Sequence, residues 1–377
     1  MVIHNRSILV MFSKTIYLSF SICLLIFGLE YAEANPRASQ KSDEVKTYLF
    51  PGTGFFIKNR DPYEDDEARE WFLEAIELQR TDELSDALKL FEKFTKRRSD
   101  LIIDFENTPT LIGPESIYRA AMIREKQGDW KKAFDHLQLI AEAYVRYDFE
   151  RISSKLLRLA ERIATEDLPK KWGVIPRLKS GADDRERFNQ IVKLSRGPKF
   201  APRALMVLAE ISLKDGKSYE AIDALERLIN FYPSHYHSEK AYFMLAEINR
   251  SLISGPSYDQ GATQDALNYY EDYLILYSGD VVQGLGEELS KFKTRKKESA
   301  ERKQSAILGR QQMRENLAMS KLEIARYVEN YGKYFLLHWE KLGNQPALQF
   351  YNQAITTAPE SDAAREAEKS VAKLRNE

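Results

Sequence analysis

The stretch LMVLAEISLKDGKSYEAIDALERLINFYP, residues 205–233, contains two amphipathic segments joined by a polar turn. On each side of the turn, apolar residues recur at intervals of three and four, which is the spacing of one helix face. Asp215-Gly216-Lys217 supplies the turn residues, and Pro233 ends the second segment because proline lacks a backbone N–H donor. Ala209 and Ala221 lie twelve residues apart, where a small side chain on each helix allows a close crossing. The stretch therefore predicts an antiparallel helical hairpin.

The same pattern of paired alanines occurs along most of the chain. The other pairs are, in chain order, Ala75 and Ala87, Ala121 and Ala133, Ala246 and Ala266, and Ala325 and Ala347. The first two of these pairs are also separated by twelve residues, whereas the last two are stretched to twenty and twenty-two. A degenerate copy lies between Arg151 and Lys199, and the stretch from Ser361 to Leu374 has the polar outer face of a terminal helix.

Repeats of this length predict a stack, because one hairpin cannot bury both of its faces and depends on its neighbours. We therefore predict an all-α fold, a tetratricopeptide-like helical-hairpin solenoid of about six units plus a capping helix. The predicted organisation is a signal peptide at 1–34, an extended N-terminal segment at 35–66, N-terminal repeats at 67–200, and C-terminal repeats with the capping helix at 201–377.

The first 34 residues differ from the rest of the chain. Residues 16–29 form an uncharged apolar run that follows Lys14 and precedes Ala32-Glu33-Ala34, a pattern typical of a secretory signal peptide cleaved after Ala34. The start is Met1 or Met11, and an uncleaved anchor is the alternative to cleavage. Cys23 lies inside the apolar run instead of at its end, which argues against lipidation. The mature chain is then free of cysteine, and we expect export to the periplasm without disulfides.

Composition argues against several classes of function. The 56 basic and 57 acidic residues balance, so no strong field for nucleic acid or for an anionic membrane surface is expected. Neither Gly-x-Ser-x-Gly nor His-Glu-x-x-His occurs, and we predict no enzyme, no catalytic residue and no cofactor. His235 and His237 lie close together in a predicted loop, but we expect no metal site because few further ligands accompany them. The run Glu64-Asp65-Asp66-Glu67 lacks the alternating ligands of a calcium loop and is placed just before a predicted helix, where acids favour the positive end of its dipole.

A stack of hairpins has a concave face, and we predict that this face is a protein-binding groove. Its lining would come from first-helix residues that do not make the hairpin contact. In the first two units these are Arg69, Phe72, Ile76, Gln79, Glu115, Tyr118, Met122 and Glu125. The alternative is that Phe72, Ile76 and Met122 are simply core residues.

The segment from Lys291 to Lys303 contains seven basic and two acidic residues. Two interpretations remain open at this point. The segment is either the solvated face of a helix extension, which is the commoner use of such charge runs, or a patch that docks an acidic partner.

The later repeats, from about Pro202 to Leu374, resemble the BamD-type lipoproteins, which are the tetratricopeptide component of the outer-membrane β-barrel assembly machinery. The resemblance rests on residues 241–252 (AYFMLAEINRSL), the following Tyr258-Asp259-Gln260, and the start of the next helix at Ala266-Leu267. It rests also on residues 309–332, where Leu317-Ala318, Glu323, Ala325-Arg326 and Tyr327 keep much of the order found in that family.

The resemblance implies a non-enzymatic periplasmic scaffold that binds a barrel-forming assembly factor or unfolded outer-membrane clients, and it allows a peripheral association with the outer membrane. Two features depart from that family: the absence of a cysteine placed for lipidation and the extra sequence at Ser290 to Gln304. The alternative function is a soluble periplasmic adaptor for cell-envelope or division machinery.

Overall fold

The computed structural model describes residues 48–49, 56–57, 62–145, 147–165, 181–255, 260–283, 288–335 and 337–376. The predicted signal peptide therefore lies outside the described residues. The chain divides into two compact units, residues 1–120 and 121–377, which are described separately below. This division differs from the predicted boundary near residue 200, because helices on the two sides of residue 200 pack against each other within the second unit.

The first unit contains the first helical hairpin and two short β-hairpins. Its elements are β1 (Tyr48–Leu49), β2 (Phe56–Ile57), α2 (Asp65–Arg80), α3 (Leu84–Phe91), the 3-10 helix η1 (Glu92–Thr95), β3 (Ile102–Phe105), β4 (Thr108–Leu111) and the first part of α4 (Ile112–Lys126). Helix α2 begins with three acids in its first turn, as the sequence predicts. It packs against α3, and Ala75 and Ala87 are both fully buried.

The β3–β4 hairpin was not predicted from the sequence. The two strands pair antiparallel, with Ile102 opposite Leu111 and Phe105 opposite Thr108. Their two-residue turn places Glu106 at φ 53° and Asn107 at φ 62°, which is the backbone that a tight type I′ hairpin requires. Asparagine accepts such a conformation more readily than most residues, so Asn107 is the local signal for this turn.

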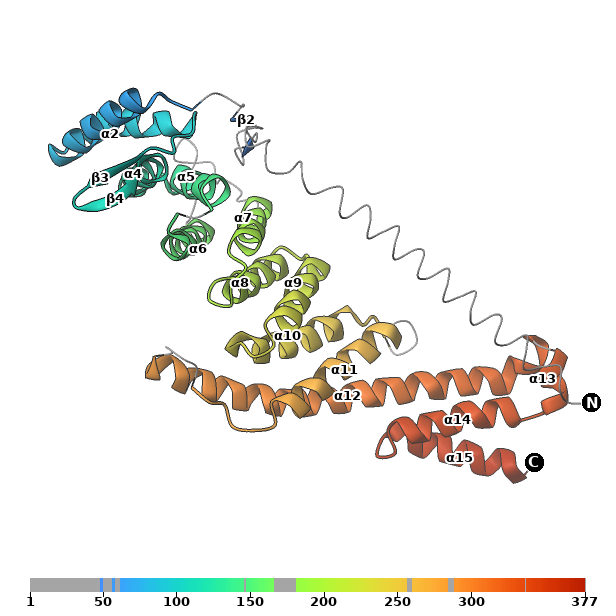
Figure 1. Cartoon of the computed structure of the whole chain (residues 1–377). Coiled ribbons are helices and arrows are strands. Elements are labelled where there is room, and N and C mark those ends of the chain that lie inside the picture. Colours follow the sequence, from blue (N-terminus) through green and yellow to red (C-terminus); the bar gives the residue numbers. More distant parts are fainter. Residues whose placement is uncertain are drawn as a thin grey trace, which may run out of the picture. The chain divides into compact units, whose positions relative to one another are not determined.

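The second unit is a succession of helices, each of which packs on the next (Figure 1). After the end of α4 they are α5 (Trp130–Ala143), α6 (Phe149–Thr165), α7 (Gly181–Leu194), α8 (Ala201–Lys214), α9 (Ser218–Phe231), α10 (Tyr236–Leu252), α11 (Gln260–Leu276), α12 (Leu289–Phe335), α13 (Leu337–Leu342), α14 (Gln345–Thr357) and α15 (Asp362–Asn376). The paired alanines of this unit are at most 2% exposed. The predicted all-α solenoid of helical hairpins is therefore confirmed, and α15 is the predicted terminal helix.

The longest described helix, α12, joins two separate parts of the core. Its 47 residues span about 70 Å at the usual rise per residue. Ala306, Met313 and Leu317 of α12 pack with buried residues of α10 and α11. Ala318 and the following turns of α12 pack instead with α14 and α15. The sequence between Ser290 and Gln304, which departs from the resembled family, is thus a helical extension of this element.

Two glycines show how closely α12 and its surroundings approach one another. A Cβ at Gly309 would overlap the ring of Tyr270 on α11, so only glycine fits that crossing. At Gly332 a Cβ would lie 3.2 Å from Cε3 of Trp339, which is tight but less so. Gly332 lies in the stretched interval between Ala325 and Ala347. In the structure it is part of α12, because the helix continues to Phe335.

A candidate protein-binding cleft

The predicted groove of the first unit is filled by the protein itself. Phe72 is fully buried, and Ile76 and Tyr118 are 3% and 6% exposed. Phe72 is covered by Phe105 of the β3–β4 hairpin and by Phe91 of α3, which it meets edge-on with 5.4 and 6.5 Å between ring centroids. Phe72, Ile76 and Tyr118 are therefore core residues, and the prediction that they line an open groove is wrong.

Arg119 of α4 completes this closure. Its guanidinium lies 5.5 Å from the centroid of the Phe105 ring. It donates a hydrogen bond to Oε1 of Gln79 at 3.0 Å and pairs with Glu115 at 2.9 Å. Gln79 and Glu115 are thus engaged within the unit. Of the predicted groove residues in this unit, Arg69 remains exposed.

The remaining predicted groove residues, Met122 and Glu125, belong to the second compact unit, where they are half-buried and contact α6. Nζ of Lys155 lies 3.1 Å from Sδ of Met122, and Glu125 pairs with Arg158 and, at 3.7 Å, with Lys155. Such pairs order the surface between neighbouring hairpins, and they leave Met122 and Glu125 partly covered. Among the described residues, the contacts of Met122 and Glu125 are those of neighbouring helices and do not indicate a binding site.

A larger hollow lies at one edge of the second unit, and we call it the basic cleft. It encloses about 800 Å³. Its walls come from the start of α8, the turn between α9 and α10, the end of α11 with the loop after it, and the first third of α12. The lining residues are Pro198, Lys199, Arg203, Pro233, Ser234, His235, Tyr236, Glu239, Leu276, Tyr277, Gly279, Asp280, Val281, Val282 and Arg295.

The first turn of α10 forms the floor of this region. His235 is the N-cap residue, and its ring Nδ1 accepts a hydrogen bond from the backbone N–H of His237 at 3.2 Å. The ring of Tyr236 is 4.3 Å from that of His235 and 4.2 Å from that of His237. These residues are predicted to lie in a loop, but in the structure His235 caps α10 and Tyr236 and His237 form its first turn.

Burial disfavours the charged form of both histidines. Burial lowers the pKa of His235. Burial lowers the pKa of His237 to about 3, with further lowering by the charges of His235, Lys240, Arg203 and Arg295. The last two residues line the cleft.

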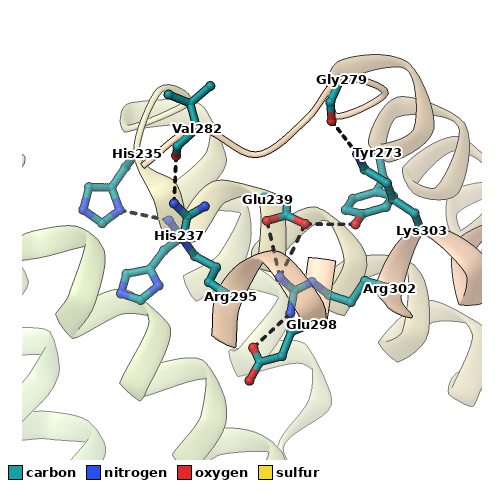
Figure 2. A network of polar contacts seen from close by, with 10 residues as sticks. All are labelled: His235, His237, Glu239, Tyr273, Gly279, Val282, Arg295, Glu298, Arg302 and Lys303. Atoms are coloured by element: carbon teal, nitrogen blue, oxygen red, sulfur yellow. Dashed lines mark hydrogen bonds and ion pairs between the residues drawn. The ribbon is translucent and has the colours of Figure 1, made fainter. Parts of the chain in front are cut away.

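A buried polar network fixes the opposite side of the cleft (Figure 2). The Glu239 carboxylate accepts a hydrogen bond from Tyr273 at 3.0 Å and pairs with Arg302 at 3.3 Å. Arg302 also pairs with Glu298 at 3.4 Å. The side chains of Glu239 and Arg302 are only 5% and 12% exposed. A buried charge pair is stable only when both partners are present, so this network ties α10, α11 and α12 together.

The basic segment of α12 divides into residues with different roles. Arg302 belongs to the buried network, and Lys303 donates to the backbone carbonyls of Ser278 and Gly279. Arg295 donates to the Val282 carbonyl at 2.9 Å, and its guanidinium lies 5.8 Å from the Tyr236 ring centroid. Lys303 and Arg295 thus hold the loop after α11 as a wall of the cleft (Figure 2). The predicted helix extension is confirmed. Its arginines do not simply face solvent, because Arg302 and Arg295 make structural contacts with neighbouring elements.

Sequence reasoning did not find the cleft because its residues come from four separate segments. Arg203 and Arg295 are 92 residues apart, and no periodicity links them. The available signal was the combination of Tyr236 after a proline-ended hairpin with a basic run on an inserted helix. These sequence features point to the Tyr236 turn and to the basic run separately, but they do not predict that the two lie close together in the fold.

Metal ligation and membrane insertion find no support in the part of the chain that the structure describes. No group of three or more histidine, cysteine, aspartate or glutamate side chains there has an arrangement that would hold a metal ion. No helix in the same residues is long and apolar enough to span a membrane.

Comparisons with known proteins agree with the repeat architecture. The tetratricopeptide repeat model matches residues 115–145 and 203–235. No curated protein matches the chain in sequence. Among solved structures, the MamA protein is similar with 17% identity and a TM-score of 0.28, covering 59% of this chain and 96% of its own. TTC0263, a tetratricopeptide protein of Thermus thermophilus, has 15% identity and a TM-score of 0.24, covering 62% and 98%.

These structural similarities are too low to carry an argument about activity, so the conclusion rests on the repeat match and on the hairpins themselves. Tetratricopeptide repeats are a scaffold for protein–protein interaction, and the matching model indicates no catalytic family. The chain therefore carries tetratricopeptide repeats within an all-α solenoid.

Proposed function

We propose that this protein is a non-enzymatic scaffold of the cell envelope, which is exported and binds other proteins through the second unit. The observation that carries the proposal is the combination of tetratricopeptide repeats with the basic cleft. The cleft is of the size of common ligand sites, which enclose roughly 300–1,000 Å³. Its walls are fixed by the buried pair of Glu239 and Arg302. A binding surface held this rigidly loses little conformational entropy when a partner docks.

The finer proposal is a role like that of the BamD-type proteins in assembling outer-membrane β-barrels. Its support is the order of residues in the two resembling stretches, together with one contact between them. Gln260, from the first stretch, donates a hydrogen bond to Oγ of Ser320 on α12 at 2.5 Å, within the second. Through this contact the two resembling stretches lie next to each other in the fold. Tyr258 and Asp259, which precede Gln260 in the sequence, lie outside the described residues.

Crosslinking in intact cells, followed by identification of the captured proteins, tests the function. Capture of a barrel-forming outer-membrane protein at stoichiometric levels supports the BamD-like role. Capture of division or wall-synthesis proteins, with release of the whole pool by osmotic shock, supports the periplasmic adaptor. A pool that keeps its first 34 residues and remains in the cytoplasm contradicts export, and mass spectrometry of the purified chain measures this directly.

A further inference from the structure

We propose that the basic cleft binds an acidic peptide segment in which carboxylates alternate with apolar side chains. The inference deepens the proposed scaffold function and rests on it. It assigns a ligand class to a surface at the helix ends of the second unit, away from the first-helix faces that were expected to bind.

The first argument is the charge of the lining. Lys199, Arg203 and Arg295 line the cleft together with two acids, Glu239 and Asp280. The charge of Glu239 is compensated by the buried Arg302. The other charged groups of the lining are three cations and Asp280, while Glu150 and Glu161, which pair with Lys199 and Arg203, lie outside the lining. Burial is the main cause of the lowered pKa of His237, and the nearby charges of Arg203 and Arg295 lower it further.

The second argument is that two of these cations, Lys199 and Arg203, are accessible to a competing carboxylate. Lys199 pairs with Glu150 at 2.7 Å, and both side chains are more than half exposed. Arg203 binds Glu161 with two hydrogen bonds, at 2.5 and 3.0 Å, and is itself 54% exposed. An exposed ion pair with a single contact contributes only about 0–1 kcal/mol, so an incoming carboxylate can replace Glu150 on Lys199 at little cost. Arg203 keeps more than half of its side chain exposed beside Glu161, so a second carboxylate can share it.

The third argument is the apolar surface beside the charges. Tyr236, Leu276 and Val282 are 41%, 58% and 81% exposed, and all three line the same cleft. Exposed large apolar side chains that gather in one hollow rimmed by charges are typical of interaction sites. Arg295 lies near the Tyr236 ring and is held by the Val282 carbonyl, so charged and apolar contacts are adjacent. A ligand that satisfies both carries acids and apolar side chains in close succession.

The size and chemistry favour a peptide over other anions. A volume of about 800 Å³ accommodates several residues, far more than one inorganic anion. A nucleic acid would gain affinity mainly from phosphate contacts along an extended basic track, whereas this surface is compact and shared with aliphatic side chains. We therefore commit to a peptide, and nucleic acid becomes an outcome of the test.

The test is fluorescence anisotropy with the purified full chain and a labelled eight-residue peptide of alternating glutamate and leucine. The reference peptide has glutamine at every glutamate position. We expect saturable binding of the acidic peptide that weakens as salt is raised, and at least about tenfold weaker binding of the reference, because each charge-assisted hydrogen bond is worth about 1.5–3 kcal/mol.

Two variants on opposite walls locate the site. Arg203→Gln and Arg295→Gln should each weaken binding of the acidic peptide by about tenfold. Because Arg295 also holds the loop after α11, Arg203→Gln provides a readout that does not depend on that loop. The control is Lys293→Gln with Lys296→Gln, which removes two charges, one more than either test variant, from the same helix but outside the lining, and it should change the affinity less than about twofold. Circular dichroism checks that every variant keeps its helix content.

Several results would overturn the proposal. They are equal binding of both peptides, an equal loss in the Lys293 and Lys296 control, or displacement of the peptide by single-stranded DNA at lower concentration than by unlabelled peptide. Crosslinking in cells separates this proposal from the scaffold function. If Arg203→Gln captures the same proteins at the same levels, the scaffold function stands and the cleft is not its site. If neither chain captures any protein, the scaffold function itself fails.

Discussion

Helices α8 and α9 and the region from α10 to α12 are built from the same repeat but are held together by different chemistry. The first pair is packed with aliphatic side chains and small residues, all at most 4% exposed: Leu205, Leu208, Ala209, Ala221, Leu225 and Leu228. In the second region, buried tyrosines carry hydroxyl groups that donate to carboxylates. Tyr270 donates to Glu247 at 2.5 Å and Tyr273 to Glu239 at 3.0 Å.

The difference shows how a repeat acquires a specific surface. Aliphatic packing is non-directional and places no constraint on side chains at the helix ends. Hydrogen-bonded tyrosines and the buried ion pair are directional, so they fix the position of the long α12 relative to α10 and α11. The basic cleft lies beside that second region. The predictions below test whether the two regions respond differently to substitution, pH and salt.

The largest effect is expected at the buried ion pair. Arg302→Met leaves the Glu239 carboxylate buried without its cation, and we expect the free energy of opening of α10 to α12 to fall by about 3–5 kcal/mol. Hydrogen exchange of the backbone amides measures this region separately from α8 and α9. In α8 and α9 protection should fall much less.

A double variant supplies the control for that prediction. Glu239→Met with Arg302→Met removes both charges, and it should be less destabilised than Arg302→Met alone because no buried charge remains. If the two variants lose the same protection, size and packing at this position matter more than charge.

The next effect concerns small residues at helix crossings. Gly309→Ala forces a methyl group into the Tyr270 ring, and Ala209→Leu overfills the crossing of α8 and α9; each should cost about 1–3 kcal/mol. Thermal unfolding and hydrogen exchange measure both. Gly261→Ala is the matched control, since a Cβ there meets nothing within 4 Å. A Gly309→Ala protein as stable as the Gly261→Ala protein would contradict the close crossing of α11 and α12.

The third effect depends on pH and belongs to the second region. The pKa of His237 is about 3 in the folded chain and near 6.5 when unfolded. Between these values the unfolded chain binds more protons, so stability is present above pH 6.5 and is lost as the pH falls. At pH 5.5 the loss is about 1 kcal/mol. Urea unfolding of His237→Gln between pH 7 and 5 should show a shallower decline than the parent; an identical decline would exclude His237 as its source.

The smallest effect concerns the ion pair that joins the two regions. Lys240 of α10 pairs with Glu210 of α8 at 2.6 Å, with both side chains more than 40% exposed. Lys240→Gln should lower stability by less than about 1 kcal/mol, and less again at high salt. A thermal melt at two salt concentrations measures this. A loss as large as that of Arg302→Met would mean that the two regions are coupled through their surface.

The sequence predicted the helical hairpins well because each depends on contacts close along the chain. The twelve-residue spacing of Ala209 and Ala221 specifies both a turn length and a crossing, and the structure buries both residues completely. The groove was predicted less well. Phe72 was placed on the open face of its helix, but Phe105 of the unpredicted hairpin covers it.

By itself, then, the sequence determined the hairpin repeat and the helical character of the basic extension, because helix periodicity and turn residues are local properties. Only the tertiary structure decided which charges meet. Glu239 and Arg302 are 63 residues apart, and their pairing depends on where α12 crosses α10. The same holds for Arg203, Tyr236 and Arg295, since a surface assembled from four segments exists only after the helices have packed.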